Sequence, residues 1–179
     1  MTAVFAAYAG AARFADRQAD WLLPTLARLV FAGVLFGYFW ASALTKLDGP
    51  FTPAMGAYAQ IFPKAFEAAG YDVGQLGLWH RLVVLAGSWA EFALPVLIVV
   101  GLFTRLAALG MAGFVVVQSL TDIYGHGAAA GGWFDRASDA LILDQRALWL
   151  LLFAALVVKG PGPISVDRLL AVERKRLAA

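Results

Sequence analysis

Apolar residues gather in four long stretches along the chain, and most polar residues fall between them. The stretches cover residues 21–44, 78–100, 106–120 and 141–158. About 20 mostly apolar residues suffice for an α-helix to cross the hydrocarbon core of a bilayer. The pattern therefore predicts four membrane-spanning helices. The fourth is uninterrupted only over the 12 residues 147–158, so its upstream extension has to include two charged residues, Asp144 and Arg146.

Proline and small residues add detail to these spans. Pro24 suits the first turn of the first span, where a helix does not need the missing N–H. Gly33, Gly37 and Ala41 recur at every fourth position, which allows another helix to approach closely. Pro95 predicts a kink in the second span.

The segments around the spans divide the chain into three parts. Residues 1–20 form an alanine-rich N-terminal segment at the membrane interface, and we expect no cleaved signal peptide because no basic region precedes an apolar run. Residues 21–160 form the membrane domain, in which the proline-containing stretch 45–77 predicts an interfacial or partly re-entrant helix. Residues 161–179 form a basic tail helix with Ser165 as its N-cap. The aromatic side chains that can rest on the membrane surface in the first part are Phe5, Tyr8 and Phe14.

Composition supports the membrane class. The chain is 61% hydrophobic and 15% charged, whereas soluble domains contain about 45–50% apolar and about 25% charged residues. Its 179 residues fit one domain. We therefore predict an all-α fold, an integral membrane four-helix bundle with the lipid bilayer as its main partner.

Several function classes are excluded by residue types and motifs. The chain has no cysteine, which excludes disulfides and iron–sulfur clusters. It also has no phosphate-binding loop, no dinucleotide glycine fingerprint and no serine–histidine–acid order. The basic tail is suited to anionic lipid and not to nucleic acid.

The basic residues predict the orientation of the bundle. An even number of spans puts both termini and the 101–105 turn on one side. Nine of the 14 lysines and arginines lie on that side and five on the other, so the positive-inside rule predicts a multi-pass protein of a bacterial-type inner membrane with cytoplasmic termini. The nine are Arg13, Arg17, Arg28, Arg105, Lys159, Arg168, Arg174, Lys175 and Arg176, and the five are Lys46, Lys64, Arg81, Arg136 and Arg146.

One carboxylate, Glu91, falls inside the second span. A charged side chain at mid-bilayer costs about 2.5–3.5 kcal/mol on insertion scales, so it is usually paired or functional. Arg28 lies at a similar depth from the same side, and Arg105 stands at the inner boundary as a second cation. We expect a buried charge pair between Arg28 and Glu91. It either holds the first two spans together or serves as a proton or quinone site.

A second group of polar residues is expected near the outer ends of the spans. It can form an outward-facing pocket, or it can be a set of interfacial side chains in which the lysine extends toward the membrane surface. The residues of this outer polar cluster are Lys46, His80, Asp122, Tyr124, His126, Asp144 and Arg146.

Metal and haem sites have weak support. His80 and His126 with a carboxylate could hold copper or zinc, but they lack a ligand spacing such as His-x-x-x-His. Neither histidine lies at mid-bilayer, which disfavours a haem. The tryptophans mostly flank span ends and are typical of an aromatic belt instead of a quinone-stacking site.

The chain resembles the DoxX family of small four-helix membrane proteins. The resemblance rests on Arg28 with the glycine-rich span after it, Lys46-Leu47, Glu91, the GLFTRLA sequence from Gly101 and the GPGPISVD sequence from Gly160. Together these elements cover about residues 25–170. A narrower subgroup, encoded beside copper-binding peptides of the bufferin type, is similar at three further segments: residues 121–126, 133–135 and 143–146.

The resemblance implies a membrane protein and leaves the mechanism open, because the biochemistry of the family is mostly unestablished and a fold does not determine a reaction. Three interpretations follow. The first, which we favour at this point, is an accessory or partner subunit of a membrane redox or metal-handling system. The second is a quinone-linked oxidoreductase component in which Glu91 and Arg28 handle protons. The third is a small transporter that works as a homo-oligomer.

Overall fold

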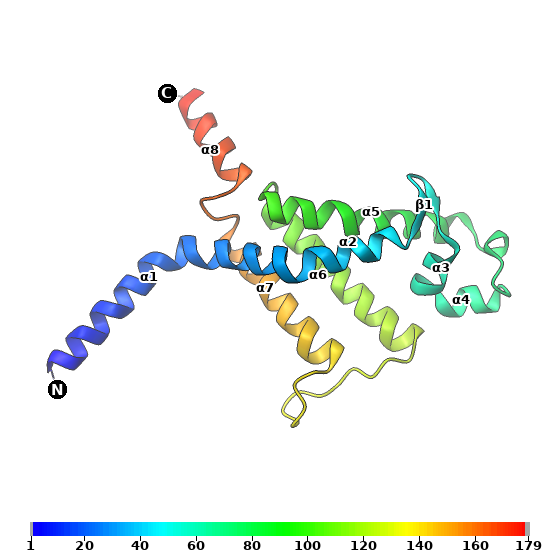
Figure 1. The fold of residues 1–179 in the computed structure, drawn as a ribbon, viewed down its shortest axis with the longest axis horizontal. Helices are drawn as coiled ribbons and strands as arrows, with labels where there is room; N and C mark the ends of the chain where they lie inside the picture. Colours follow the sequence, from blue (N-terminus) through cyan, green and yellow to red (C-terminus); the bar gives the residue numbers. More distant parts are fainter. Residues whose placement is uncertain (1, 178–179) are drawn as a thin grey trace.

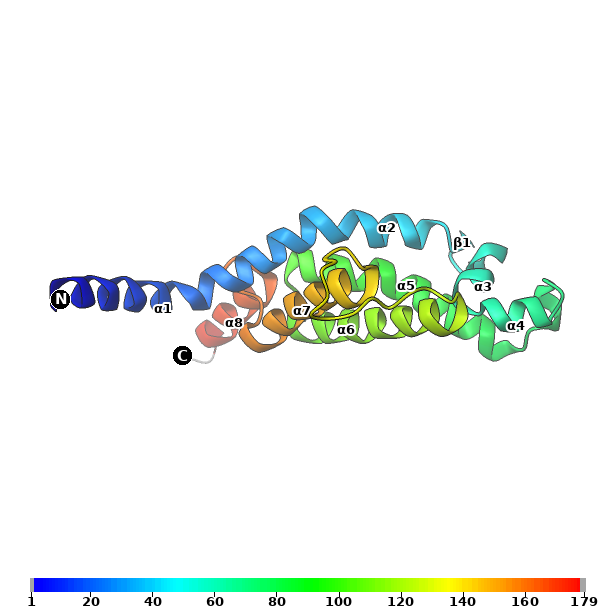
Figure 2. The ribbon, with the colours of Figure 1, turned by 90° about the horizontal axis from the view of Figure 1, so that it is seen from below.

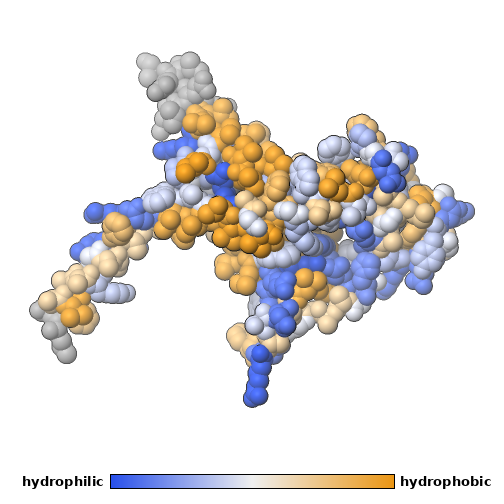
Figure 3. All heavy atoms as spheres, viewed as in Figure 1, coloured by the Kyte–Doolittle hydropathy of each residue, from blue (hydrophilic) through white to orange (hydrophobic). Residues whose placement is uncertain are grey.

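The computed structural model describes the chain from residue 2 to residue 177, and its side chains from residue 3 to residue 171. Within this part, four helical segments are long and apolar enough to cross a membrane (Figure 1). They are Ala3–Leu44, Leu78–Val100, Thr104–Gly125 and Leu141–Lys159. The prediction of an all-α, four-span membrane protein is confirmed. Apolar atoms cover the middle of the molecule, and hydrophilic atoms gather toward the end with α3 and α4 (Figure 3).

The helix that contains the first span is longer than the predicted span. It is continuous through α1 (Thr2–Val30), the π-helical segment η1 (Phe31–Phe36) and α2 (Gly37–Leu44). Because the helix begins well before residue 21, Pro24 lies inside α1, and the prediction that it occupies a first turn is wrong. The reason is that the alanine-rich sequence before residue 21 favours helix strongly. Figure 1 shows α1 bending between its N-terminal half and the part that joins the bundle, as proline inside a helix commonly causes.

The other three spans match the prediction closely. The second is α5 (Leu78–Val100). The third is α6 (Thr104–Leu120) with the π-helical segment η3 (Thr121–Gly125). The fourth is η4 (Leu141–Arg146), also π-helical, with α7 (Ala147–Lys159), so the extension through Asp144 and Arg146 is confirmed. The tail helix is α8 (Val166–Leu177), and the side chains of its basic residues 174–176 lie outside the described ones.

The segment between the first two spans folds into short elements and not one re-entrant helix. It contains a small antiparallel hairpin of β1 (Leu47–Gly49) and β2 (Thr52–Pro53), followed by α3 (Met55–Ile61), α4 (Pro63–Ala68) and the 3₁₀ turn η2 (Val73–Gln75). Its buried residues Ala57, Tyr58 and Phe66 pack with Val84 of α5. The segment covers the end of the bundle opposite the two termini (Figures 1 and 2).

The main core is aromatic and lies where the first span meets α6 and α7. Phe31, Leu35 and Phe39 follow one another at every fourth position and point inward. Phe31 packs edge-on against Phe153, with ring centroids 5.8 Å apart. Because Phe31, Leu35 and Phe39 pack into the core, Gly33 and Gly37 face outward. An added Cβ at either glycine would meet no atom within 4 Å. The close helix approach that they allow does not occur among the residues that the structure describes.

Candidate functional site

Glu91 is paired with Lys46. Lys46 Nζ donates to Glu91 Oε2 at 2.8 Å and to Oε1 at 3.0 Å, and it also donates to the hydroxyl oxygen of Ser42 at 2.5 Å. Glu91 is 2% exposed and Lys46 6%. The predicted pair of Arg28 with Glu91 is therefore wrong, and so is the expectation that Lys46 extends to the membrane surface.

Helix periodicity explains why these groups meet. The buried residues of α5 are Val84, Ser88, Glu91, Pro95 and Ile98, spaced alternately by four and three positions. This spacing is typical of the inward stripe of a helix, so Glu91 occupies a core position. A buried carboxylate without a partner is costly. Lys46 provides that partner because it follows directly on the end of α2.

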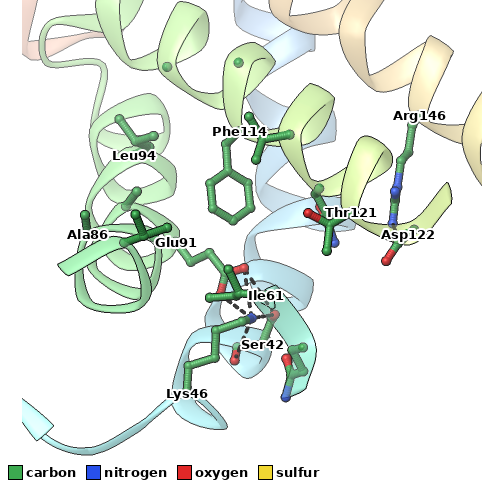
Figure 4. Close-up of a pocket in the computed structure, with 18 of the residues that line it drawn as sticks. Ser42, Lys46, Ile61, Ala86, Glu91, Leu94, Phe114, Thr121, Asp122 and Arg146 are labelled. Atoms are coloured by element: carbon green, nitrogen blue, oxygen red, sulfur yellow. Dashed lines mark hydrogen bonds and ion pairs between the residues drawn. The ribbon is translucent and has the colours of Figure 1, made fainter. Parts of the chain in front are cut away.

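The pair stands in the wall of a cavity of about 660 Å³ (Figure 4). Residues from α2, α3, α5, α6, η3 and η4 line it. Five of the eleven lining residues that α5 and α6 contribute are alanine or glycine, whose small side chains leave space open. These residues are Ala86, Gly87, Ala90, Gly110 and Gly113.

A second ion pair lines the same cavity. Arg146 Nη2 donates to Asp122 Oδ2 at 2.5 Å, and Arg146 Nη1 donates to Ser119 Oγ at 3.2 Å. Arg146 is 2% exposed. Asp122 and Arg146 belong to η3 and η4, and π-helical turns occur frequently at functional sites because they redirect side chains. Figure 4 shows this pair across the cavity from Lys46 and Glu91.

The structure brings only part of the outer polar cluster together. Lys46, Asp122, His126 and Arg146 line the cavity, where His126 Nε2 is 3.0 Å from the backbone oxygen of Gln60. The other three members lie elsewhere. His80 packs on the ring of Phe62 at 4.8 Å, Asp144 accepts from the backbone N–H of Ala140, and Tyr124 is exposed.

The two histidines do not share a site. His80 contacts Phe62 and His126 contacts Gln60, and the described residues contain no group of three or more histidine, cysteine, aspartate and glutamate side chains that could hold a metal ion. The structure therefore gives the metal interpretation no support.

Arg28 acts at the end of the bundle near the termini. Its guanidinium donates to the backbone oxygens of Ile98 at 2.9 Å and Val99 at 2.5 Å in the last turn of α5. It also donates to the oxygens of Pro161, at 2.9 Å, and Ile164 in the tail. The last carbonyls of a helix have no partner within it. Arg28 therefore caps α5 and ties the tail to it.

Arg105 and the tail complete this set of helix caps. Arg105 Nη1 donates to Val157 O at 2.5 Å and to Val158 O at 2.9 Å, at the end of α7. The Asp167 carboxylate accepts from the backbone N–H groups of Phe103 at 2.8 Å and Thr104 at 2.9 Å, at the start of α6. Ser165 caps α8, as predicted, by accepting from the N–H of Arg168. Arg28 and Arg105 therefore have structural roles far from Glu91.

Comparison with protein families decides the identity. A family model, described as DoxX, matches residues 23–121, which is more than half of the chain. The chain belongs to the DoxX family. Comparison with curated proteins and with solved structures finds no match.

The DoxX match includes Arg28, Lys46, Glu91 and Arg105 and ends before Arg146 and the tail. The narrower resemblance to the bufferin-associated subgroup depends on residues from 121 onward and stays a prediction. Sequence reasoning missed the pairing of Lys46 with Glu91. A usable signal was present, because Lys46 follows Ala43 by three positions and continues the inward stripe of Phe31, Leu35 and Phe39.

Proposed function

We propose that this DoxX protein binds a neutral, lipid-soluble ring compound of the quinone class in its bundle cavity, as a component of a membrane redox system. The observation that carries the proposal is the cavity itself, which places a buried ion pair, Lys46 with Glu91, and a partly exposed one, Arg146 with Asp122, beside mostly apolar walls. Binding sites for small molecules are commonly of about 300–1,000 Å³ and combine apolar walls with a few polar groups that fix orientation.

The charge balance of the wall favours a neutral ligand. The lysine, arginine, aspartate and glutamate residues that line the cavity are Lys46, Glu91, Asp122 and Arg146, and each is paired with another of the four. A charged ligand would have to break one of these pairs or stay unpaired in a site of low dielectric, which is costly. A quinone ring avoids that cost, because its carbonyl oxygens need only hydrogen-bond donors.

The exposed part of the lining favours a ligand that arrives through the lipid. Several residues at the wall are themselves exposed and apolar, whereas the charged side chains Lys46, Glu91 and Arg146 are buried. A long isoprenoid tail can then remain among the acyl chains while the ring lies inside. The exposed apolar lining residues are Ala86, Gly113, Val117 and Leu141.

This proposal favours the quinone-linked interpretation over the accessory subunit that the sequence alone favoured. Lys46 and Glu91, and not Arg28, are the groups beside the ligand. The accessory-subunit interpretation remains compatible, because a quinone-binding component without cysteine-ligated clusters needs a partner chain to exchange electrons with the ring. Transport and homo-oligomerisation stay predictions. So does the location in a bacterial-type inner membrane with cytoplasmic termini.

The test is quinone binding to the purified protein in lipid nanodiscs. We expect mass spectrometry to detect copurified quinone, and a short-chain quinone to quench tryptophan fluorescence in a saturable way. Gly113→Leu should weaken quinone binding about tenfold or more, equivalent to roughly 1.4 kcal/mol. Gly113 lines the cavity, and a Cβ added there meets no atom within 4 Å, so the new side chain can occupy space that the ligand needs.

Gly33→Leu is the matched control. An added Cβ there also meets no atom within 4 Å, but Gly33 faces outward and does not line the cavity. Binding by the control should equal that of the unaltered protein. The proposal fails if no quinone binds, or if both leucine variants bind as well as the unaltered protein.

A further inference from the structure

We propose that the first half of α1, residues 3–20, lies on the membrane surface on the side of the termini, with its apolar face in the lipid and its charged face in water. The proposal concerns a surface remote from the cavity and does not depend on quinone binding. It follows from the distribution of side chains on this helix, from what surrounds them, and from where the helix joins the bundle.

The side chains of this segment separate into two faces. At about 100° per residue, Arg13, Asp16, Arg17 and Asp20 fall on one face, because they follow the i, i+3, i+4, i+7 pattern. The opposite side of the helix, within about 50° of the point opposite the charged face, carries Val4, Tyr8, Ala15 and Leu22. Phe5 and Phe14 lie between the two faces, one on each side.

The apolar face has no partner among the described residues. Val4 and Tyr8 are each 74% exposed, and Phe5 and Phe14 at its two edges are 68% and 66% exposed. Figures 1 and 2 show this half of α1 extending away from the other helices. Large aromatic and aliphatic side chains exposed together on one helix face indicate an interaction surface, and an amphipathic helix of this kind can lie in a membrane interface.

The position of this half of α1 indicates that lipid covers its apolar face. The segment is continuous with the first membrane span, so its C-terminal end is held at the bilayer boundary. An ion pair fixes the charged face there, since Lys159 Nζ at the end of α7 donates to Asp20 Oδ1 at 2.9 Å. Other apolar side chains are exposed at the same end of the bundle, as expected where headgroups meet acyl chains. They include Phe103, Ile164 and Leu169.

The charges on the polar face predict the kind of lipid interaction. Arg13 and Arg17 are balanced by Asp16 and Asp20, so attraction to anionic headgroups contributes little. Burial of the apolar face then provides the driving force, and binding should occur on zwitterionic lipid and persist at high salt.

The absence of cysteine makes a direct test simple. Single cysteines replace Val4 or Tyr8 on the apolar face, and Arg13 or Arg17 on the charged face, in the full chain. Each cysteine carries a nitroxide spin label, and the protein is held in phosphatidylcholine nanodiscs. A label in lipid is accessible to oxygen, and a label in water is accessible to a water-soluble nickel chelate. We expect labels at positions 4 and 8 to be severalfold more accessible to oxygen than to the nickel chelate, and the reverse at positions 13 and 17.

Two outcomes would overturn the proposal. High nickel accessibility at all four positions would show that the helix projects into water. Low accessibility to both reagents at positions 4 and 8 would show that protein covers the apolar face, as in contact with a second copy. All four side chains are exposed, so the substitutions leave the packed part of the fold unchanged. Quinone binding is measured on the same samples and should be the same in all of them.

Discussion

At the scale of single residues, the pair of Lys46 and Glu91 stabilises the fold and, in our proposal, contacts the quinone. Substitutions can separate these two roles. A lone Lys46→Met leaves a buried carboxylate without its partner, and breaking such a pair destabilises a protein by about 3–5 kcal/mol. Replacing both partners, as Lys46→Met with Glu91→Leu, removes both charges and should recover most of that loss. Thermal unfolding in detergent, followed by circular dichroism, measures the three proteins.

The double variant then tests function on a folded protein. We expect it to bind quinone at least about tenfold more weakly, since it lacks the Lys46 N–H that in our proposal turns from Ser42 Oγ to a ring oxygen when quinone binds. Unchanged quinone binding in the double variant would assign the pair to structure alone. A single variant as stable as the double one would contradict the account of a paired, buried charge.

Arg28 is a residue for which lysine is not an adequate substitute. Its planar guanidinium reaches four backbone oxygens from two segments, at Ile98, Val99, Pro161 and Ile164. An ammonium group is a point charge with three donors and does not have this fork geometry. We expect Arg28→Lys to lower the free energy of unfolding by about 1–3 kcal/mol, the range for leaving buried acceptors unsatisfied.

Arg13→Lys provides the comparison for Arg28, because Arg13 is exposed on the N-terminal half of α1. Its unfolding midpoint should not change. Equal midpoints for the two lysine variants would show that the helix caps made by Arg28 contribute nothing to stability.

At the scale of helices, the tail has a structural role through Asp167. Its carboxylate accepts from two backbone N–H groups at the start of α6 and from the Thr104 hydroxyl. Loss of an N-terminal cap costs about 0.5–2 kcal/mol. We expect Asp167→Ala to destabilise the protein by that amount and to expose the 101–105 turn to proteolysis. Limited proteolysis with Asp16→Ala, a change at an exposed site, as the control measures this effect.

The helices also show which parts of the fold could be predicted. Hydropathy located α5 to the residue, because a span has to match the bilayer whatever its neighbours are. It did not locate the start of α1, since alanine favours helix without being apolar enough to define a span. The π-helical turns η3 and η4 depend on local packing and left no pattern in the sequence.

In the candidate site, the partner of Glu91 was harder to predict than the span that contains it. Depth along the helix suggested Arg28 as the partner of Glu91, but depth says nothing about which backbone oxygens compete for a guanidinium. In the structure, Arg28 donates to backbone oxygens at the end of α5 and in the tail. Lys46, which follows the last turn of α2, pairs with the Glu91 carboxylate instead. The membership of the outer cluster was predicted in part, because periodicity identifies an inward face but not the partners of residues at helix ends such as His80, in the first turn of α5.

At the scale of the whole molecule, the remaining question is which side of the membrane holds the termini. Four spans place both termini on one side, and Figure 1 shows both at the same end of the bundle. The excess of lysine and arginine on that side predicts that it is cytoplasmic.

Because the chain has no cysteine, two single-cysteine variants suffice to test this orientation. They are Arg17→Cys at the end with the termini and Arg136→Cys in the segment between η3 and η4. In spheroplasts, a membrane-impermeant maleimide should label position 136 at once and position 17 only after lysis. The opposite pattern would reverse the orientation and place Lys46 and the cavity nearer the cytoplasm. Labelling of both positions before lysis would contradict the three spans that separate them.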